Sequence, residues 1–156
     1  MKESWIKIFG SLIGIIILII AVSIIFLENK LGFAFAFLVL GLIFLVMIRI
    51  FGIKIKSIYP NLIFGFIDDS LLVLTSTIGG LTAGVGGAII GGAAGNAITD
   101  AIGGLFEGKI AEKMKKEKIK ENRSAIATMF GKVTGCLFGA GVMILIIWIL
   151  RRIFNI

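Results

Sequence analysis

Three aspartates, Asp68, Asp69 and Asp100, lie within stretches of the chain that are otherwise almost entirely apolar. On membrane-insertion scales, each charged carboxylate costs about 2.5 to 3.5 kcal/mol near the centre of a spanning helix. No lysine or arginine lies in the middle of these stretches to neutralise the charge. The remaining partners are protons, waters, neighbouring polar groups or a bound cation, and we expect the aspartates to hold a cation.

Two of the aspartates are expected at the same depth in the bilayer. Asp68 lies eight residues after Pro60, which begins one apolar stretch. Asp100 lies eight residues before Gly108, which ends the next stretch. At 1.5 Å per residue, both lie about 12 Å from the same membrane face. Antiparallel helices joined at Gly79-Gly80 would therefore bring these two carboxylates to one level.

Other side chains with oxygen donors lie on the helical face of Asp100 or beside it: Asn96, Thr99 and Glu107. Carboxylate, amide and hydroxyl donors without histidine or cysteine suit Ca²⁺, Mg²⁺, Mn²⁺ or Na⁺ and argue against zinc or copper. The predicted cation-binding residues are Asp68, Asp69, Asn96, Thr99, Asp100 and Glu107, of which Asp68, Asn96 and Asp100 are the predicted metal ligands. Asp69 is expected in an auxiliary role, because it points about 100° away from Asp68 around a helix. Glu107 is auxiliary because it lies at the interface.

A purely structural interpretation of these residues stays open. The Asp68-Asp69 pair could reach the membrane interface, while Asn96 and Asp100 form hydrogen bonds between helices. In that case no ion is required. Glu107 would then be a solvated residue at the end of a helix.

The elements that must position these groups are apolar helices. Hydrophobic residues make up 58% of the 156 residues and charged residues only 16%, which is too apolar for a water-soluble globule of this size. A bilayer core of about 30 Å needs about 20 apolar residues in a helix. Five stretches approach or meet that length, at 5–27, 31–51, 60–79, 81–107 and 125–150. The sequence therefore predicts an all-α polytopic membrane protein with about five transmembrane helices, the first of them retained as an anchor.

The helices are expected to fall into two parts. Residues 1–56 would form two N-terminal transmembrane helices, and residues 57–150 a glycine-rich core of three helices with a charged cytoplasmic loop at 109–124. With five spans, twelve of the sixteen basic residues fall on one side of the membrane and three on the other. Positive residues stay on the cytoplasmic side, so we expect a multi-pass protein of the cell membrane with a cytoplasmic N-terminus.

Glycine is concentrated in the second part of the chain, where eleven of the thirty residues from Gly79 to Gly108 are glycine. Two ladders have the small-xxx-small spacing that lets helix backbones approach closely in lipid. They consist of Gly87, Gly91 and Gly95 and of Gly131, Gly135 and Gly139. We expect these ladders to pack on one another or on a second copy of the chain. Flexing helices beside an ion path are the functional alternative.

Several classes of function lack their residues. The chain has no histidine and a single cysteine, Cys136, which excludes a Cys/His zinc site, a histidine general base and a disulfide framework. The net charge of +7 could suggest nucleic acid, but seven basic residues gather between Lys109 and Arg123 among glutamates, as in a solvated helix. No enzyme activity, resident cofactor or nucleic-acid partner is expected. An intramembrane aspartyl protease is disfavoured, because neither Asp68 nor Asp100 lies in the sequence contexts of that class.

Three segments resemble the transmembrane protein 65 family of the mitochondrial inner membrane and its prokaryotic relatives. These are Phe64 to Asp69, Gly95 to Asp100, and Gly131-Lys132 with Gly135, Cys136 and Gly139. The resemblance covers roughly residues 60–148 and leaves the first two spans outside. It implies exchange of sodium for calcium, with Asp68, Asn96 and Asp100 as the polar positions carried over. Asp69 departs from the usual asparagine at its position and adds a charge.

The leading hypothesis is thus a membrane cation transporter that exchanges Ca²⁺ or a similar ion for Na⁺ or H⁺ at intramembrane carboxylates. We expect a homodimer, because three core helices are few to enclose an ion path. The alternative is a membrane scaffold or regulator that transports nothing and assembles with a cation carrier through its glycine ladders. Ion flux through the purified protein distinguishes the two.

Overall fold

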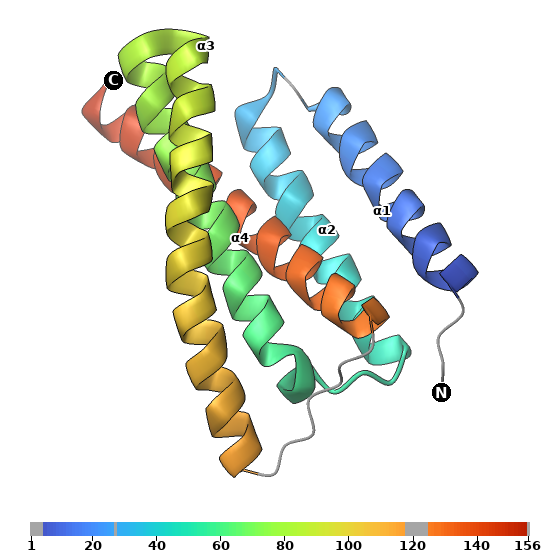
Figure 1. Ribbon diagram of the computed structural model, residues 1–156. Helices are drawn as coiled ribbons and strands as arrows, with labels where there is room; N and C mark the ends of the chain where they lie inside the picture. Colours follow the sequence, from blue (N-terminus) through green and yellow to red (C-terminus); the bar gives the residue numbers. More distant parts are fainter. Residues whose placement is uncertain (1–4, 27, 118–124, 156) are drawn as a thin grey trace.

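The computed structural model describes residues 5–26, 28–117 and 125–155, and these residues are almost entirely helical. Four helices follow one another along the chain: α1 (Trp5–Ile25), α2 (Lys30–Ile50), α3 (Ile55–Lys116) and α4 (Ala125–Phe154) (Figure 1). All four are long and apolar enough to cross a membrane. Large apolar side chains cover their outer surfaces, as at Ile17, which is 61% exposed. Such a surface suits lipid rather than water.

The predicted stretches 60–79 and 81–107 belong to one element, α3, so the described chain has four helices where five separate ones were expected. The backbone of α3 leaves helical geometry at Ala83 and Gly84. There the helix doubles back, which gives a first arm, residues 55–82, and a second arm, residues 85–116 (Figure 1). Gly84 has a φ of +62°, a conformation that favours glycine. The reversal thus lies a few residues beyond the predicted joint at Gly79-Gly80.

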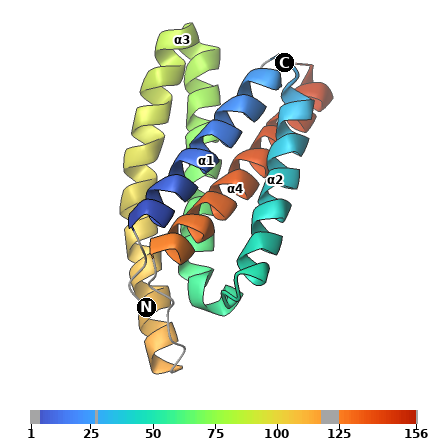
Figure 2. The same cartoon turned by 90° about the vertical axis from the view of Figure 1, so that its right-hand side faces the viewer.

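The first arm of α3 lies between the second arm and α4, and α4 packs on its other side against α2 (Figures 1 and 2). An apolar core of large side chains joins α2 to α4, with the rings of Phe44 and Phe130 centred 5.5 Å apart. Close helix contact continues at Gly41, which lies against the ring of Phe138. In Figure 2, α1 lies at the edge of the bundle beside α2 and α4. The predicted division of the chain into two parts at residue 56 stays a prediction. In the structure, α2 of the first part packs against α4 of the second.

Local signals account for where several helices begin and end. Asn29 caps α2, because its side-chain oxygen accepts a hydrogen bond of 2.9 Å from the Gly32 amide. The first arm of α3 begins at Ile55, earlier than predicted, and runs through Pro60, where only one backbone donor is missing. At its other end α3 continues to Lys116, so a large part of the predicted charged loop at 109–124 is helix.

The two ends of the bundle differ in charge. The start of α1, the connection between α2 and α3, and the end of α3 lie at one end (Figure 1). The connection between α1 and α2, the tip of the α3 hairpin and the C-terminus lie at the other. The first end carries Lys54, Lys56 and the basic last turn of α3, and the second carries Lys30, Arg151 and Arg152. Which end faces the cytoplasm stays a prediction.

Candidate cation site

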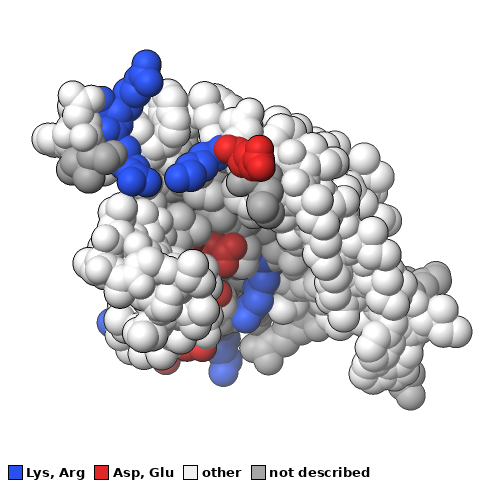
Figure 3. Space-filling view, turned by 90° about the horizontal axis from the view of Figure 1, so that it is seen from above, with Lys and Arg blue, Asp and Glu red and all other residues white. Residues whose placement is uncertain are grey.

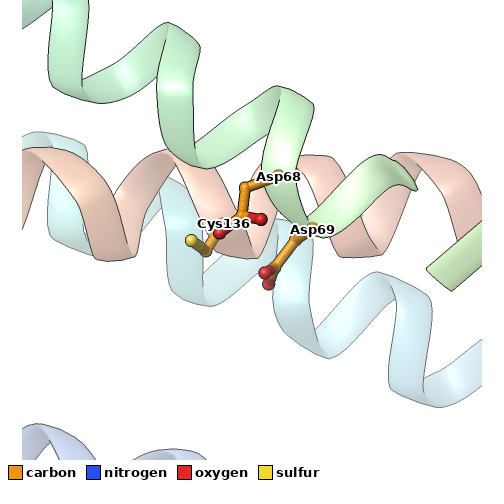
Figure 4. Close-up of side chains that lie close together, drawn as sticks. All are labelled: Asp68, Asp69 and Cys136. Carbon is orange, nitrogen blue, oxygen red and sulfur yellow. The ribbon is translucent and has the colours of Figure 1, made fainter. Parts of the chain in front are cut away.

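Two carboxylates and a thiol meet inside the bundle. Asp68 and Asp69 belong to the first arm of α3, and Cys136 reaches toward them from α4 (Figure 4). One possible ligand atom from each residue lies within 4.8 Å of the other two. Two oxygens on opposite sides of a Ca²⁺ ion, each 2.3 to 2.6 Å away, are about 5 Å apart. The spread of these three groups therefore fits a single ion.

Missing side chains explain why α4 comes so close to the first arm. A β-carbon at Gly135 would overlap the carbonyl oxygen of Leu62, and one at Gly139 would overlap that of Phe66. The hydroxyl of Ser70 also donates a hydrogen bond of 3.3 Å to the Gly139 carbonyl. Since glycine lets the two backbones touch, Cys136 lies beside the aspartates rather than a side chain's length away.

The second arm closes the other side of Asp68 in the same way. A β-carbon at Gly91 would overlap the Thr75 carbonyl oxygen, and one at Gly95 would overlap the Thr75 hydroxyl. Thr99 lies one turn after Gly95 on the same arm. Its hydroxyl is 2.6 Å from Asp68 Oδ1 and 2.8 Å from the Asn96 carbonyl oxygen. A hydroxyl carries one proton, so Thr99 donates to one of these acceptors at a time.

The predicted pairing of Asp68 with Asp100 differs from what the structure brings together. Thr99 contacts Asp68, whereas Asp100 is exposed and accepts a bond of 3.4 Å from the Asn96 amide, which is exposed too. Neighbouring residues of a helix point about 100° apart, and here Thr99 is buried against the first arm while Asp100 points to the exposed side. Among the described residues, Asp100 is consequently absent from the cluster of Asp68, Asp69 and Cys136, and the Asn96 amide is bonded to Asp100. The side chain of Glu107 lies outside the described ones.

Asp69 was expected to point away from the site, but the structure places it in the cluster. Its carboxylate and that of Asp68 both lie near the Cys136 thiol, without a break in the helix between them. The two side chains start about 100° apart around the helix, yet one oxygen of each lies within 4.8 Å of the thiol sulfur. Both aspartates therefore take part in the cluster.

Cys136 is the member that sequence reasoning missed as a ligand. The signal was present, since this lone cysteine follows a ladder glycine at Gly135, but its position against the first arm depends on the packing of α4. Zinc and copper were disfavoured because the predicted ligands included no cysteine or histidine, and the position of the Cys136 thiol removes that argument. Two carboxylates and a thiol suit hard ions through oxygen and borderline divalent ions through sulfur.

A cavity of about 410 Å³ opens from the end of the bundle that carries Lys30 and Arg151. All four helices line it, and Val73 and Thr77 of the first arm are among its walls. Val73 lies one turn after Asp69 on the same helical face. Figure 3 looks onto this end and shows acidic and basic side chains in a hollow of the surface. The site thus lies one helical turn from a space that reaches the outside.

The two glycine ladders do not pack on one another. Each packs on a different side of the first arm. Gly87, Gly91 and Gly95 lie against Gly79 and Thr75, while Gly131, Gly135 and Gly139 lie against the stretch from Ile58 to Phe66. The first arm is therefore the element that both ladders serve. It also carries both aspartates of the cluster.

Two further polar groups lie toward the other end of the bundle from the cavity. Lys132 of α4 holds its ammonium 4.3 Å from the centre of the Phe64 ring. Asn61 of the first arm is only 2% exposed, and its Nδ2 has no hydrogen-bond partner among the described residues. Neither residue was among the predicted site residues.

Comparisons with protein-family models, with curated proteins and with solved structures found no match to this chain. The resemblance to the transmembrane protein 65 family therefore stays a prediction from three short segments. What the chain can do chemically rests on its own geometry, in which two carboxylates and a thiol meet among membrane-length helices.

Proposed function

We propose that the chain is a membrane transporter that binds a divalent cation such as Ca²⁺ at Asp68, Asp69 and Cys136 and exchanges it for Na⁺ or H⁺. The observation that carries this proposal is the cluster itself, with its three groups within 4.8 Å of one another between apolar helices. Two carboxylates this close repel each other unless a cation or a proton lies with them. A site of this kind attracts a cation and can also release it.

The surroundings of the cluster favour transport over a purely structural ion site. The cavity has Val73 among its lining residues and so comes from one end of the bundle to within one turn of Asp69. The first arm meets both neighbours along rows of glycine, where the backbones touch. Such smooth contacts allow one helix to slide along another, which is one way in which a site becomes open to alternate sides.

Ion flux in proteoliposomes tests the proposal. Purified protein should exchange external Ca²⁺ or Mn²⁺ for internal Na⁺ or protons faster than protein-free vesicles do, and Asp68→Asn should remove that activity. Because Cys136 is the only cysteine of the chain, alkylation by N-ethylmaleimide reports on the same site, and a bound cation should slow it. Protein without flux that co-purifies with a cation carrier would instead support a scaffold or regulator.

We also propose that the transporter is a homodimer assembled through the outer face of the second arm. Small residues follow that face at helical spacing and are all exposed: Ala93, Ala97, Ala101, Gly104 and Gly108. Asn96 and Asp100 are exposed on the same arm. Polar side chains within membrane spans usually face protein, and small residues let a second helix approach. A second copy of the chain would satisfy both requirements.

A further inference from the structure

Lys132 lies on α4 one helical turn before Cys136, among the apolar helices. A β-carbon at Gly65 would meet the backbone of both Lys132 and Cys136, so this turn of α4 lies directly against the first arm. Gly65 in turn lies one turn before Asp69. The lysine and the carboxylates therefore occupy neighbouring turns of the same pair of helices.

The ammonium of Lys132 lies 4.3 Å from the centre of the Phe64 ring. Phe64 is one turn before Asp68, and its ring fills the space beside Gly103 of the second arm. Among the described side chains, this ring rather than an acidic group is the partner of the ammonium. A ring attracts an ammonium more weakly than a carboxylate does in a medium of low dielectric constant. The lysine is thus held on its weaker partner, close to the stronger one.

We propose that Lys132 is a tethered counter-ion that competes with the transported cation for Asp68 and Asp69. Four residues along a helix span about 6 Å, a distance that the flexible four-carbon stem of lysine can cover. In the proposed cycle, the ammonium rests on the Phe64 ring when a cation occupies the carboxylates. Without one, it moves onto the carboxylates.

This inference rests on the proposed function and adds to it a reason why the empty site is tolerated. Two uncompensated carboxylates would oppose any movement of the empty site within the membrane. An ammonium supplied by α4 removes that opposition without a second ion. Lys132 would act as a positioning and regulating residue for the carboxylates and would not itself bind the cargo.

Equilibrium binding of Ca²⁺ to the full chain in detergent tests the inference, with protection of Cys136 from N-ethylmaleimide as the readout. Lys132→Met removes the competitor and should lower the half-protecting Ca²⁺ concentration about tenfold. Lys132→Arg keeps a tethered cation and should stay close to the unaltered protein. Lys113→Met removes a charge from the exposed ion pair with Glu117 and controls for net charge.

Phe64→Leu provides a second test with the opposite sign. It removes the ring on which the ammonium rests, so the ammonium should stay on the carboxylates and the half-protecting Ca²⁺ concentration should rise severalfold. Combined with Lys132→Met, the same change should have no effect on Ca²⁺ binding, because the competitor is gone. A merely structural role for the lysine would produce neither the opposite signs nor this loss of effect.

The outcomes separate this inference from the proposed function. Equal Ca²⁺ affinity in Lys132→Met and in the unaltered protein, with clear protection in both, would overturn the counter-ion role and leave the cation site standing. No protection by Ca²⁺ or Mn²⁺ in any variant would overturn the site and the counter-ion together. If Lys132→Met fails to fold, Phe64→Leu and Lys132→Arg still decide.

Discussion

α4 and the second arm of α3 pack against the same element, the first arm of α3, yet their other sides differ. The far side of α4 is covered by α2, through the contact of Gly41 with Phe138 and that of Phe44 with Phe130. The far side of the second arm is open, with Val85 80% and Leu105 62% exposed. Both helices touch the first arm through glycine, so the contrast lies in what covers them.

This difference explains which carboxylates form the cluster. Asp68 and Asp69 lie beside α4, a helix that α2 covers on its other side. Asp100 belongs to the open side of the second arm. A charge inside a membrane favours protein surroundings, so the open side should be completed by another copy of the chain.

The largest expected effect is the loss of ion flux when an aspartate beside α4 is replaced. Asp68→Asn and Asp69→Asn should each lower the Ca²⁺ flux about 100-fold, because each removes one of two charged oxygen ligands. Asp100→Asn should change the flux less than threefold, since that carboxylate lies outside the cluster. Flux measured in proteoliposomes with matched protein content would refute the comparison if Asp100→Asn were the most damaging change.

Substitution of glycine should lower the stability more where α4 touches the first arm than on the open face of the second arm. Gly135→Leu should lower the free energy of unfolding by about 2 kcal/mol, because its side chain would overlap the backbone of the first arm. Gly104→Leu should have little effect on the monomer, since a β-carbon at that position meets nothing within 4 Å. Thermal melting in detergent measures both. Equal losses for the two variants would show that the open face of the second arm is not open in the folded monomer.

Association should depend on the open face alone. Ala97→Phe adds bulk to the exposed stripe of small residues and should weaken dimerisation about tenfold. Val39→Phe, on the exposed face of α2, serves as the control and should leave dimerisation unchanged. Cross-linking and light scattering over a range of protein-to-detergent ratios provide the measurement. A protein that stays monomeric throughout would rule out the proposed interface.

The smallest effect is expected in the core between the first arm and α4. Asn61 is buried with an unpaired amide nitrogen, so Asn61→Leu should raise the stability by about 1 kcal/mol. Thr134→Val is the matched control, because the Thr134 hydroxyl is satisfied by the Phe130 carbonyl at 2.6 Å and its removal should bring no gain. A lower melting temperature for Asn61→Leu would indicate that the amide has a bound water or ion as its partner.

The course of the helices could be predicted from the sequence because their length and apolar character depend on local composition. The five predicted stretches overlap the four described helices, with ends that differ by a few residues, and the reversal of α3 lies near the predicted glycine joint. The reversal was misplaced by a few residues, since Gly79-Gly80 and Gly84 are equally able to break a helix. Packing decides between them, because Gly79 is needed for its contact with Gly87.

The site was harder to predict because it depends on which face each helix presents. Equal depth was a matter of counting residues, and the contact of Thr99 with Asp68 puts the two arms in register to within one residue of the expectation for Asp100. One residue is also a rotation of about 100°, which separates a side chain inside the site from one outside it. The part played by Cys136 depends on contacts between segments nearly seventy residues apart, for which the spacing along the chain carries no signal.

The two-residue reversal at Ala83 and Gly84 makes the protein sensitive to insertions in a way that single substitutions do not reveal. An added residue there would rotate the whole second arm by about 100° relative to the first. Gly87, Gly91 and Gly95 would lose their contacts at one stroke, and Thr99 would leave Asp68. The length of this turn is therefore constrained as strongly as the ladder glycines of the hairpin, where a β-carbon would overlap the first arm.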